Sequence, residues 1–417
     1  MRANVFFREN RTKDTPLAKL PQDWAVARLS SVARLIMGQS PPSSTYNREG
    51  VGLPFLQGKM EFGEIYPSPE TYCSDPLRVA EPNDVLISVR APVGDVNLAP
   101  DKLCIGRGLA AIRFDRNIAN HLFYFYFLQR IKSSIERLGK GSTFKAIVKD
   151  DLENLNVAFP PLREQQKIAE IFSTVDEAIQ KTSEIIATTE RLKKGLIQKL
   201  LTGGIGHKEF KETEIGRIPE EWKVTRLDEV AKVRSGRPKF GSDVKETAFI
   251  PMELVPEEGI HVSFQMKSLD SISSSTYCEA GDILLAKITP SLENGKQGIV
   301  PKTIPGRFAL ATTEVFPIIC ENVERMFLFY LLKFMKFRKI LEGSMRATTG
   351  RLRVPREALL NLRIPVPKVE EQQRIASTLS TVDQKLEVER NEKSELEIIK
   401  RGLMDLLLSG KIRIKVN

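Results

Sequence analysis

The chain has 417 residues, of which 41% are hydrophobic and 28% charged, and its formal net charge is +10 at pH 7. This length exceeds one ordinary core and indicates two or more domains, and the apolar content excludes an intrinsically disordered protein. No stretch approaches the roughly 18 apolar residues of a transmembrane helix, and the N-terminus lacks the apolar centre of a signal peptide. We therefore expect a cytoplasmic protein that does not engage a membrane, and its basic excess permits a nucleic-acid partner.

Motifs of catalysis and metal binding are missing from the sequence. The four cysteines form no CxxC pair and the three histidines are scattered, so we expect neither a zinc site nor a disulfide framework. The segment 139–143 (GKGST) resembles a phosphate-binding loop superficially, but the upstream glycine spacing of that loop is absent. A methyltransferase would show a glycine-rich cofactor loop and an Asn/Asp-Pro-Pro-aromatic motif, and neither is found. We expect no catalytic residue, no metal and no cofactor in this chain.

An internal duplication organises the chain. The two tryptophans, Trp24 and Trp222, occupy equivalent places in two copies of one pattern. The clearest matches are LPQDW at 20–24 with IPEEW at 218–222, DVLI at 84–87 with DILL at 282–285, EQQKIA at 164–169 with EQQRIA at 371–376, and STVD at 173–176 with STVD at 380–383. The duplication predicts four segments in the order globule, helix, globule, helix. Their predicted bounds are 1–159 and 207–367 for the globular segments, and 160–206 and 368–417 for the helical segments, the last with a C-terminal tail.

Each helical segment predicts one long helix. Prolines precede each start, Gly203-Gly204 and Gly410 follow the ends, and each helix spans about 39 residues, or about 58 Å. Apolar residues recur at three- and four-residue spacing, interrupted by polar residues such as Lys193. The predicted seam consists of Ile168, Phe172, Val175 and Ile179 in the first copy and of Ile375, Leu379, Val382 and Leu386 in the second.

Helices of this length with a narrow apolar seam need a partner. If a pseudo-two-fold axis relates the two copies, the helices pair antiparallel and the globular segments lie at opposite ends. The alternative is that each helix folds back on its own globular segment.

Each globular segment is expected to mix strands and helices. Short apolar runs at 84–89 and 282–288 predict strands, and turn roles are expected for Asp84 and Asp282 at their starts. Aromatic-rich runs at 121–128 and 326–332 predict buried core helices; the alternative is an aromatic platform on which bases stack.

These motifs resemble the specificity subunits of Type I restriction-modification systems. The resemblance rests on Pro-x-x-Trp-x-x-x-x-Leu opening each globular segment, the Asp-Val-Leu-Ile strand, and Pro-x-Pro or Pro-Pro before Glu-Gln-Gln-x-Ile-Ala opening each long helix. It covers nearly the whole chain. It implies an α+β fold: two mixed α/β target-recognition domains, related by the internal repeat and separated by two long antiparallel coiled-coil helices.

The resemblance also implies partners. Each domain would read one half of a bipartite double-stranded DNA target, and the helices would space the domains and dock two modification subunits. Those subunits would bind S-adenosylmethionine and methylate adenine, and restriction subunits would use ATP and magnesium. None of this chemistry is expected in this chain itself.

The candidate DNA contacts lie where the two copies differ most. The net positive charge sits on the globular segments, and the stretch 344–353 (SMRATTGRLR) is rich in arginine and hydroxyl groups, which read guanine and phosphates. A second candidate is the loop after the Asp-Val-Leu-Ile strand, and a third is Gln57-Gly58-Lys59. The candidate residues are Gln57, Lys59, Arg90, Lys140, Ser142, Thr143 and Lys145 in the first copy, and Lys287, Lys296, Arg346, Thr348, Thr349, Arg351 and Arg353 in the second. A solvated loop is the alternative for 344–353.

Three other functions remain open from the sequence. The chain could be the separate specificity domain of another multi-subunit restriction or methylation enzyme, which differs mainly in its partner. It could be a coiled-coil adaptor without a DNA role, or, against the missing motifs, an enzyme by itself.

Overall fold

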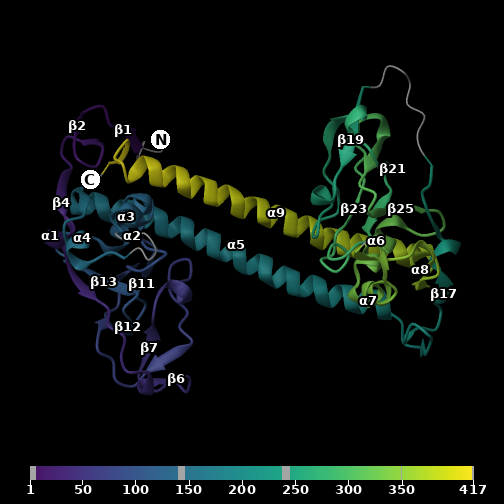
Figure 1. Cartoon of the computed structure of the whole chain (residues 1–417), viewed down its shortest axis with the longest axis horizontal. Coiled ribbons are helices and arrows are strands. Elements are labelled where there is room, and N and C mark those ends of the chain that lie inside the picture. Colours follow the sequence, from purple (N-terminus) through teal and green to yellow (C-terminus); the bar gives the residue numbers. More distant parts are fainter. Residues whose placement is uncertain (1–5, 140–145, 237–244, 349, 416–417) are drawn as a thin grey trace. The chain divides into compact units, whose positions relative to one another are not determined.

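A computed structural model of the chain describes residues 6–139, 146–236, 245–348 and 350–415 (Figure 1). It divides into two compact units, residues 1–181 with 393–417 (unit 1) and residues 182–392 (unit 2). Two long helices, α5 (Leu162–Gly203) and α9 (Val369–Leu407), each contribute one end to unit 1 and the other end to unit 2. Both predicted long helices are therefore present. Each unit contains one end of each helix, so unit 1 combines the first and last segments of the chain.

The described part of unit 1 holds two larger sheets and three strand pairs. The four-stranded sheet has the order β11 (Val96–Leu98), β10 (Val85–Ser88), β13 (Leu109–Phe114), β5 (Ala33–Met37). The five-stranded sheet has the order β6 (Tyr46–Asn47), β8 (Thr71–Cys73), β7 (Leu53–Leu56), β12 (Leu103–Ile105), β9 (Val79–Ala80). The pairs are β1 (Phe6–Arg8) with β29 (Ile412–Ile414), β2 (Thr12–Asp14) with β3 (Lys19–Pro21), and β4 (Ala25–Arg28) with β14 (Asn156–Phe159). The short helices are α1 (Leu29–Val32), α2 (His121–Arg130), α3 (Lys132–Leu138) and α4 (Lys149–Glu153).

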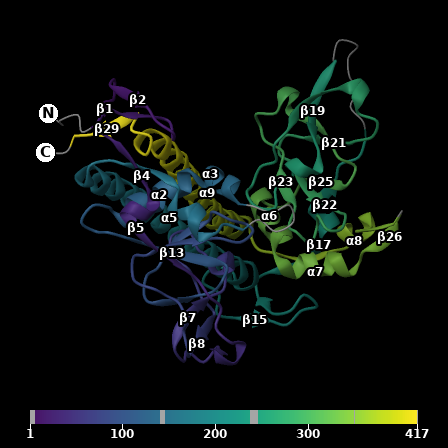
Figure 2. The same ribbon diagram turned by 60° about the vertical axis from the view of Figure 1, so that its left-hand side comes forward.

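Unit 2 repeats this plan (Figure 2). Its first sheet has the order β23 (Gln297–Ile299), β22 (Ile283–Ala286), β25 (Val315–Cys320), β18 (Ala231–Val233), and its second the order β20 (Gln265–Ser268), β19 (Glu246–Ile250), β24 (Phe308–Ala311), β21 (Thr276–Glu279). The pairs are β15 (Phe210–Lys211) with β16 (Ile218–Pro219), β17 (Lys223–Arg226) with β28 (Arg363–Val366), and β26 (Arg346–Thr348) with β27 (Arg351–Arg353). The short helices are α6 (Arg325–Lys333), α7 (Met335–Gly343) and α8 (Arg356–Leu360). The equivalent strands β10 and β22 each lie inside a four-stranded sheet, so the duplication read from the sequence is a duplication of topology.

The aromatic-rich runs form buried helices, as predicted. All residues from Phe123 to Leu128 in α2 are buried, and so are all residues from Phe327 to Leu332 in α6. Apolar side chains around the whole circumference mark a helix that is enclosed on every side. These rings are therefore core, and the alternative of an exposed base-stacking platform is wrong.

The motif Glu-Gln-Gln fastens the start of each long helix to its domain. In unit 1 the Trp24 indole Nε1 donates to Glu164 at 3.0 Å, and Gln165 accepts from the Asn120 amide at 2.8 Å. In unit 2 the Trp222 Nε1 donates to Glu371 at 3.0 Å. Gln372 there accepts from the Glu324 amide at 2.7 Å. The repeated tryptophan and glutamate are thus partners in a junction that is buried in unit 1 and partly buried in unit 2.

The two long helices run antiparallel within each unit. In unit 1 the start of α5 packs near the end of α9, where Lys400 pairs with Asp176 at 2.6 Å. In unit 2 the end of α5 packs near the start of α9, where Lys193 pairs with Asp383 at 2.5 Å. Each aspartate also accepts a hydrogen bond from a core tyrosine, Tyr126 or Tyr330, at 2.7 Å. Lys193, which interrupts the apolar seam in the sequence, is therefore one half of a repeated ion pair between the helices.

The predicted seam residues divide between two environments. Ile168 and Phe172 are fully buried in the core of unit 1, together with Leu407 from the end of α9. Ile375 and Leu379 are equally buried in the core of unit 2, together with Leu200 from the end of α5. Ile179 and Leu386 are also buried, whereas Val175 and Val382 are half-buried. The seam of each long helix therefore packs both against its own globular segment and against the other helix. The structure combines the two alternatives, helix pairing and packing onto the globular segment.

We predict that Asp176→Ala and Asp383→Ala each lower the free energy of unfolding by about 2–4 kcal/mol, because each leaves a lysine and a tyrosine hydroxyl without their buried acceptor. Urea denaturation of the purified chain measures this loss. Glu177→Ala and Glu387→Ala, which remove exposed carboxylates from the same helices, serve as controls and should cost less than about 0.5 kcal/mol. Equal losses for the aspartate and glutamate variants would contradict the prediction.

Candidate nucleic-acid interface

Two candidate segments that lie far apart in the sequence meet in each unit. In unit 1 the Ile147 amide donates to the carbonyl of Val89 at 2.9 Å, and Arg90 forms an isolated bridge with Ala146. In unit 2 the equivalent Val354 amide donates to the carbonyl of Lys287 at 2.8 Å. The loop after β10 or β22 is therefore joined by the same backbone bond to the segment that precedes α4 or α8.

The third candidate segment joins the same loop. In unit 1, Lys59 lies in the turn η2 (Lys59–Glu61) after β7, and its Nζ contacts Asp95 at 2.5 Å. In unit 2 the equivalent turn is η4 (Met252–Leu254), whose Met252 carbonyl accepts from the Lys296 Nζ at 2.9 Å. We call these joined segments the loop face of each unit: 57–59, 90–95 and 146 in unit 1, and 252–254, 287–296 and 344–353 in unit 2.

Several candidate cations of the loop faces hold the protein together. The Nζ of Lys296 also donates to the Val255 carbonyl, and the Nζ of Lys287 lies 5.2 Å from the centre of the Phe316 ring. Burial lowers the pKa of Lys287. Arg353 forms two 2.9 Å hydrogen bonds with Glu314 and thereby lowers the pKa of that carboxyl. These side chains have structural partners, which the sequence did not indicate.

Other candidate side chains are exposed. Gln57 and Arg90 are exposed in unit 1, and Arg346 and Arg351 in unit 2. Thr348 ends strand β26. Lys140, Ser142, Thr143, Lys145 and Thr349 lie outside the described residues. The assignment of the candidates as DNA contacts stays a prediction.

The stretch 344–353 is a β-hairpin rather than the loop expected from its sequence. Strands β26 and β27 pair Arg346 with Arg353 and Thr348 with Arg351. Gly350, in the turn between them, has a φ of +78°, a conformation that favours glycine. Pairing across a short turn was not readable because the stretch lacks the alternating apolar pattern of a strand.

A buried arginine that the sequence did not single out supports the loop face of unit 2. Arg338 of α7 is 1% exposed, and its guanidinium donates to the Leu292 carbonyl and to the side chain of Gln297. In unit 1, Lys132 of α3 supports the equivalent loop by contacting Asp95 at 2.5 Å. Both cations belong to the charged runs that follow the aromatic helices. The sequence alone does not distinguish Arg338 and Lys132 from the surface charges of these runs, because only the structure shows what they contact.

The strand-start aspartates have the turn role expected for them and one more. Asp84 accepts from the Glu81 amide at 2.8 Å, and Asp282 from the Glu279 amide at 2.9 Å. Each also receives an arginine in two hydrogen bonds, Arg113 in unit 1 and Arg234 in unit 2. Because Arg113 lies in β13 and Arg234 directly follows β18, the two arginines are not at equivalent positions, and sequence alignment of the two copies does not reveal them.

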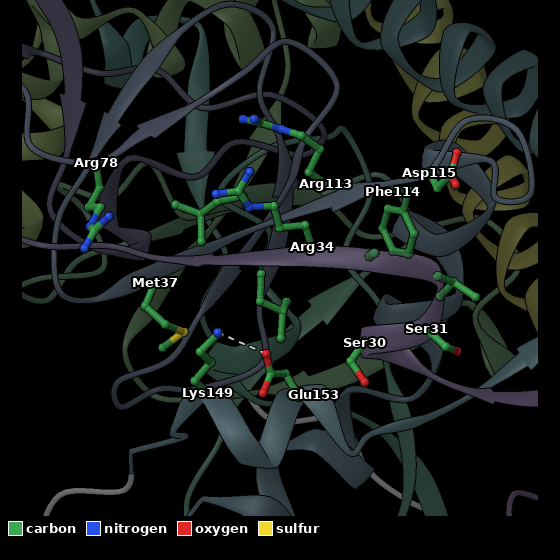
Figure 3. A pocket seen from close by; sticks show the side chains of 14 residues that line it. Ser30, Ser31, Arg34, Met37, Arg78, Arg113, Phe114, Asp115, Lys149 and Glu153 are labelled. Atoms are coloured by element: carbon green, nitrogen blue, oxygen red, sulfur yellow. Dashed lines mark ion pairs between the residues drawn. The ribbon is translucent and has the colours of Figure 1, made fainter.

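A pocket of about 880 Å³ lies beside β5, at the edge of the four-stranded sheet in unit 1. Figure 3 shows the guanidinium groups of Arg34, Arg78 and Arg113 on one side of this strand, and Lys149 and Glu153 on the other. Lys149 and Glu153 pair at 3.1 Å, and Arg113 is neutralised by Asp84. Arg34 and Arg78 are exposed, so the lining suits a polyanion better than an apolar ligand.

The described residues contain no cluster of side chains suited to a metal ion. Among them, no three His, Cys, Asp or Glu side chains are placed to hold a metal ion. The four cysteines are free, and burial raises the pKa of the Cys278 thiol to about 12. No described helix is both long and apolar enough to span a bilayer.

Comparison with known proteins assigns these domains to a class. Residues 21–191 and 219–398 each match the Type I restriction modification DNA specificity domain, so the chain contains two DNA specificity domains. The chain belongs to the Type I restriction-modification DNA specificity family, which confirms the resemblance read from its motifs.

Relatives support this assignment over the whole length. The MjaVIII specificity subunit of Methanocaldococcus jannaschii is 30% identical over 98% of both chains. The putative MjaX specificity subunit of the same organism is 49% identical, over 48% of this chain and about half (47%) of its own length. The Type I S subunit from M. genitalium has the same fold, with a TM-score of 0.60 and 18% identity over 97% of this chain and 100% of its own.

We predict that Asp95→Asn lowers the free energy of unfolding by about 1 kcal/mol at pH 7, because two lysines lose their shared carboxylate. Burial opposes the ionisation of Asp95, but Lys132 and Lys59 offset it and hold its pKa below the usual value. The stabilisation is therefore fully present above the pKa of an unfolded aspartate, about 3.9, and is lost progressively as the pH falls from there through the lower pKa of the folded state.

Urea denaturation from pH 7 down to pH 3.5 measures this dependence. The exposed Asp101→Asn in the same unit is the control and should have little effect at any pH. A loss of stability in Asp95→Asn that does not shrink below about pH 4 would show that the ion pairs are not its cause.

Proposed function

We propose that this chain selects the DNA target of a restriction-modification complex, and that each of its two domains reads one half of a bipartite sequence. The observation that carries this proposal is the repeated loop face. In both units the same backbone bond joins the same two segments, while the side chains on those segments differ. A constant frame with variable loops is what two domains need in order to read different half-sites.

The long helices are the proposed docking surface for two modification subunits. Large apolar side chains are exposed on them: Ile185, Leu192 and Val388 in unit 2, and Ile398 and Ile399 in unit 1. Exposed apolar side chains rimmed by charged ones are typical of protein interfaces. A structure entitled as showing complex assembly and conformational transition of the type I R-M system has the same fold, with a TM-score of 0.54.

The chemistry of the complex would belong to its other subunits. We propose that the chain itself is not catalytic and binds no cofactor. S-adenosylmethionine would be bound by the modification subunits, and ATP and magnesium would be used by restriction subunits. The chain would supply double-stranded DNA recognition and the geometry of assembly.

We predict that the chain assembled with its modification subunits methylates adenine within a two-part sequence, and that the chain alone has no methyltransferase, ATPase or nuclease activity. Methylome sequencing of a host with and without the gene identifies both half-sites. Replacing residues 219–367 by the equivalent domain of a relative should change one half-site and leave the other intact. Methylation that does not depend on this chain, or turnover that copurifies with the chain alone, would contradict the proposal.

A further inference from the structure

The β26–β27 hairpin of unit 2 gathers three arginines on one of its faces. Arg346 lies directly opposite Arg353, and Arg351 is two residues from Arg353 on the same strand. Side chains alternate between the two faces of a strand, so all three start from the same face. Ala347 and Leu352, which pair with one another, occupy the other face.

The three arginines are not equivalent. Arg353 is half-buried and its guanidinium is bonded to Glu314 through two 2.9 Å hydrogen bonds. Arg346 and Arg351 are exposed. Like charges opposite one another across a ribbon destabilise it, and the carboxylate of Glu314 offsets this repulsion for Arg353. The face therefore consists of one neutralised arginine and two exposed ones.

The base of the hairpin is fixed to the rest of the loop face. The Thr289 amide donates to the Leu352 carbonyl at 3.1 Å, and the Val354 amide donates to the Lys287 carbonyl at 2.8 Å. Arg353 adds a side-chain bond from the hairpin to Glu314, which lies between β24 and β25. A ribbon held at its base presents its exposed side chains in a defined place, as a reading element requires.

We propose that this hairpin enters the major groove of the half-site read by unit 2, where Arg346 and Arg351 contact guanines and Arg353 positions the ribbon through Glu314. This rests on the proposed function. A two-stranded ribbon fits the major groove, and an arginine donates two hydrogen bonds to guanine O6 and N7 there. The half-site of unit 2 therefore contains at least one guanine that the hairpin recognises.

Arg346→Ala and Arg351→Ala test the two reading residues in the complex with its modification subunits. Each should relax the preference for one base pair of one half-site, with a loss of about 5- to 150-fold against the correct sequence. The other half-site should keep its full selectivity. The control is Lys302→Ala, which removes an exposed charge from the same unit and should leave both half-sites unchanged.

The measurement is binding to two DNA libraries, each randomised in one half-site, at two salt concentrations. Replacing the recognised guanine by 7-deazaguanine should weaken the parent complex and have little further effect on the arginine variant that lost that contact. A loss that is equal for all sequences, with a smaller salt slope, would place the arginines on phosphates and overturn base reading. Unchanged binding by both variants would overturn it as well. If the parent complex shows no selectivity in either library, the proposed function itself fails.

A charge exchange tests the positioning role of Arg353. Arg353→Ala should weaken the selectivity of the unit 2 half-site, and the double variant Arg353→Glu with Glu314→Arg should restore it, because the ion pair is rebuilt in the opposite sense. If Arg353 contacts DNA directly, the glutamate now at position 353 repels the phosphates and the double variant stays defective. Failure of this rescue would overturn the positioning role.

Discussion

A glutamate at the start of each long helix, buried at Glu164 and half-buried at Glu371, is the constraint on which the rest of the structure depends. Glu164 is 1% exposed and accepts hydrogen bonds from the Trp24 indole and from Arg413. Taking a carboxylate out of water is costly unless its lone pairs are satisfied, so the helix start, the tryptophan and the arginine hold one another in place. Arg413 also pairs with Glu9 and Asp23, which fastens the C-terminal strand β29 beside β1.

The equivalent junction of unit 2 uses the same acceptor with different donors. Glu371 accepts from Trp222, from the Ile205 amide at 2.9 Å and from His207 at 2.9 Å. The donors that replace Arg413 come from the turn after α5, where Gly204 has a φ of +63°. A side chain at that glycine would meet the Glu371 carboxylate and the Trp222 ring. The glycine that ends the helix in the sequence therefore also makes room for the junction.

These junctions leave the loop faces free to vary. In each unit the tryptophan–glutamate junction and the tyrosine–aspartate–lysine cluster lie on the helices and the core, while the candidate DNA contacts lie on segments 57–59, 90–95, 252–254, 287–296 and 344–353. The partners described above for Glu164, Glu371, Asp176 and Asp383 lie outside those segments, so we expect substitutions there to leave these carboxylates bonded. The junctions and the tyrosine–aspartate–lysine clusters are thus physically separate from the loop faces. This separation explains why the two copies agree in the motifs that define the family and differ where the target would be read.

The sequence predicted the parts of the fold that depend on periodicity and repetition. The two long helices, the buried aromatic helices α2 and α6, and the strands β10 and β22 all follow from patterns local to the chain. It did not predict that Lys193 and Lys400 pair with Asp383 and Asp176, because each pair joins two helices far apart in the sequence. The β26–β27 hairpin was missed because its residues lack the alternating apolar pattern of a strand, and the sequence did not indicate its backbone bonds to the loop after β22.

The sequence does not show which basic side chains of this protein are exposed and which are bonded within it. Lys59, Lys296, Arg338 and Arg353 count toward the basic excess, yet each is bonded to carbonyls or carboxylates of the protein. Their charge is therefore already offset or turned inward, and we expect these cations to shape the loop face. In the proposed function, exposed side chains such as Arg34, Arg78, Arg90, Arg346 and Arg351 would supply the attraction for a polyanion. In the proposed function, exposed arginines held on a fixed frame would favour selectivity, since the loss of one base contact then changes which sequence is bound as much as how tightly.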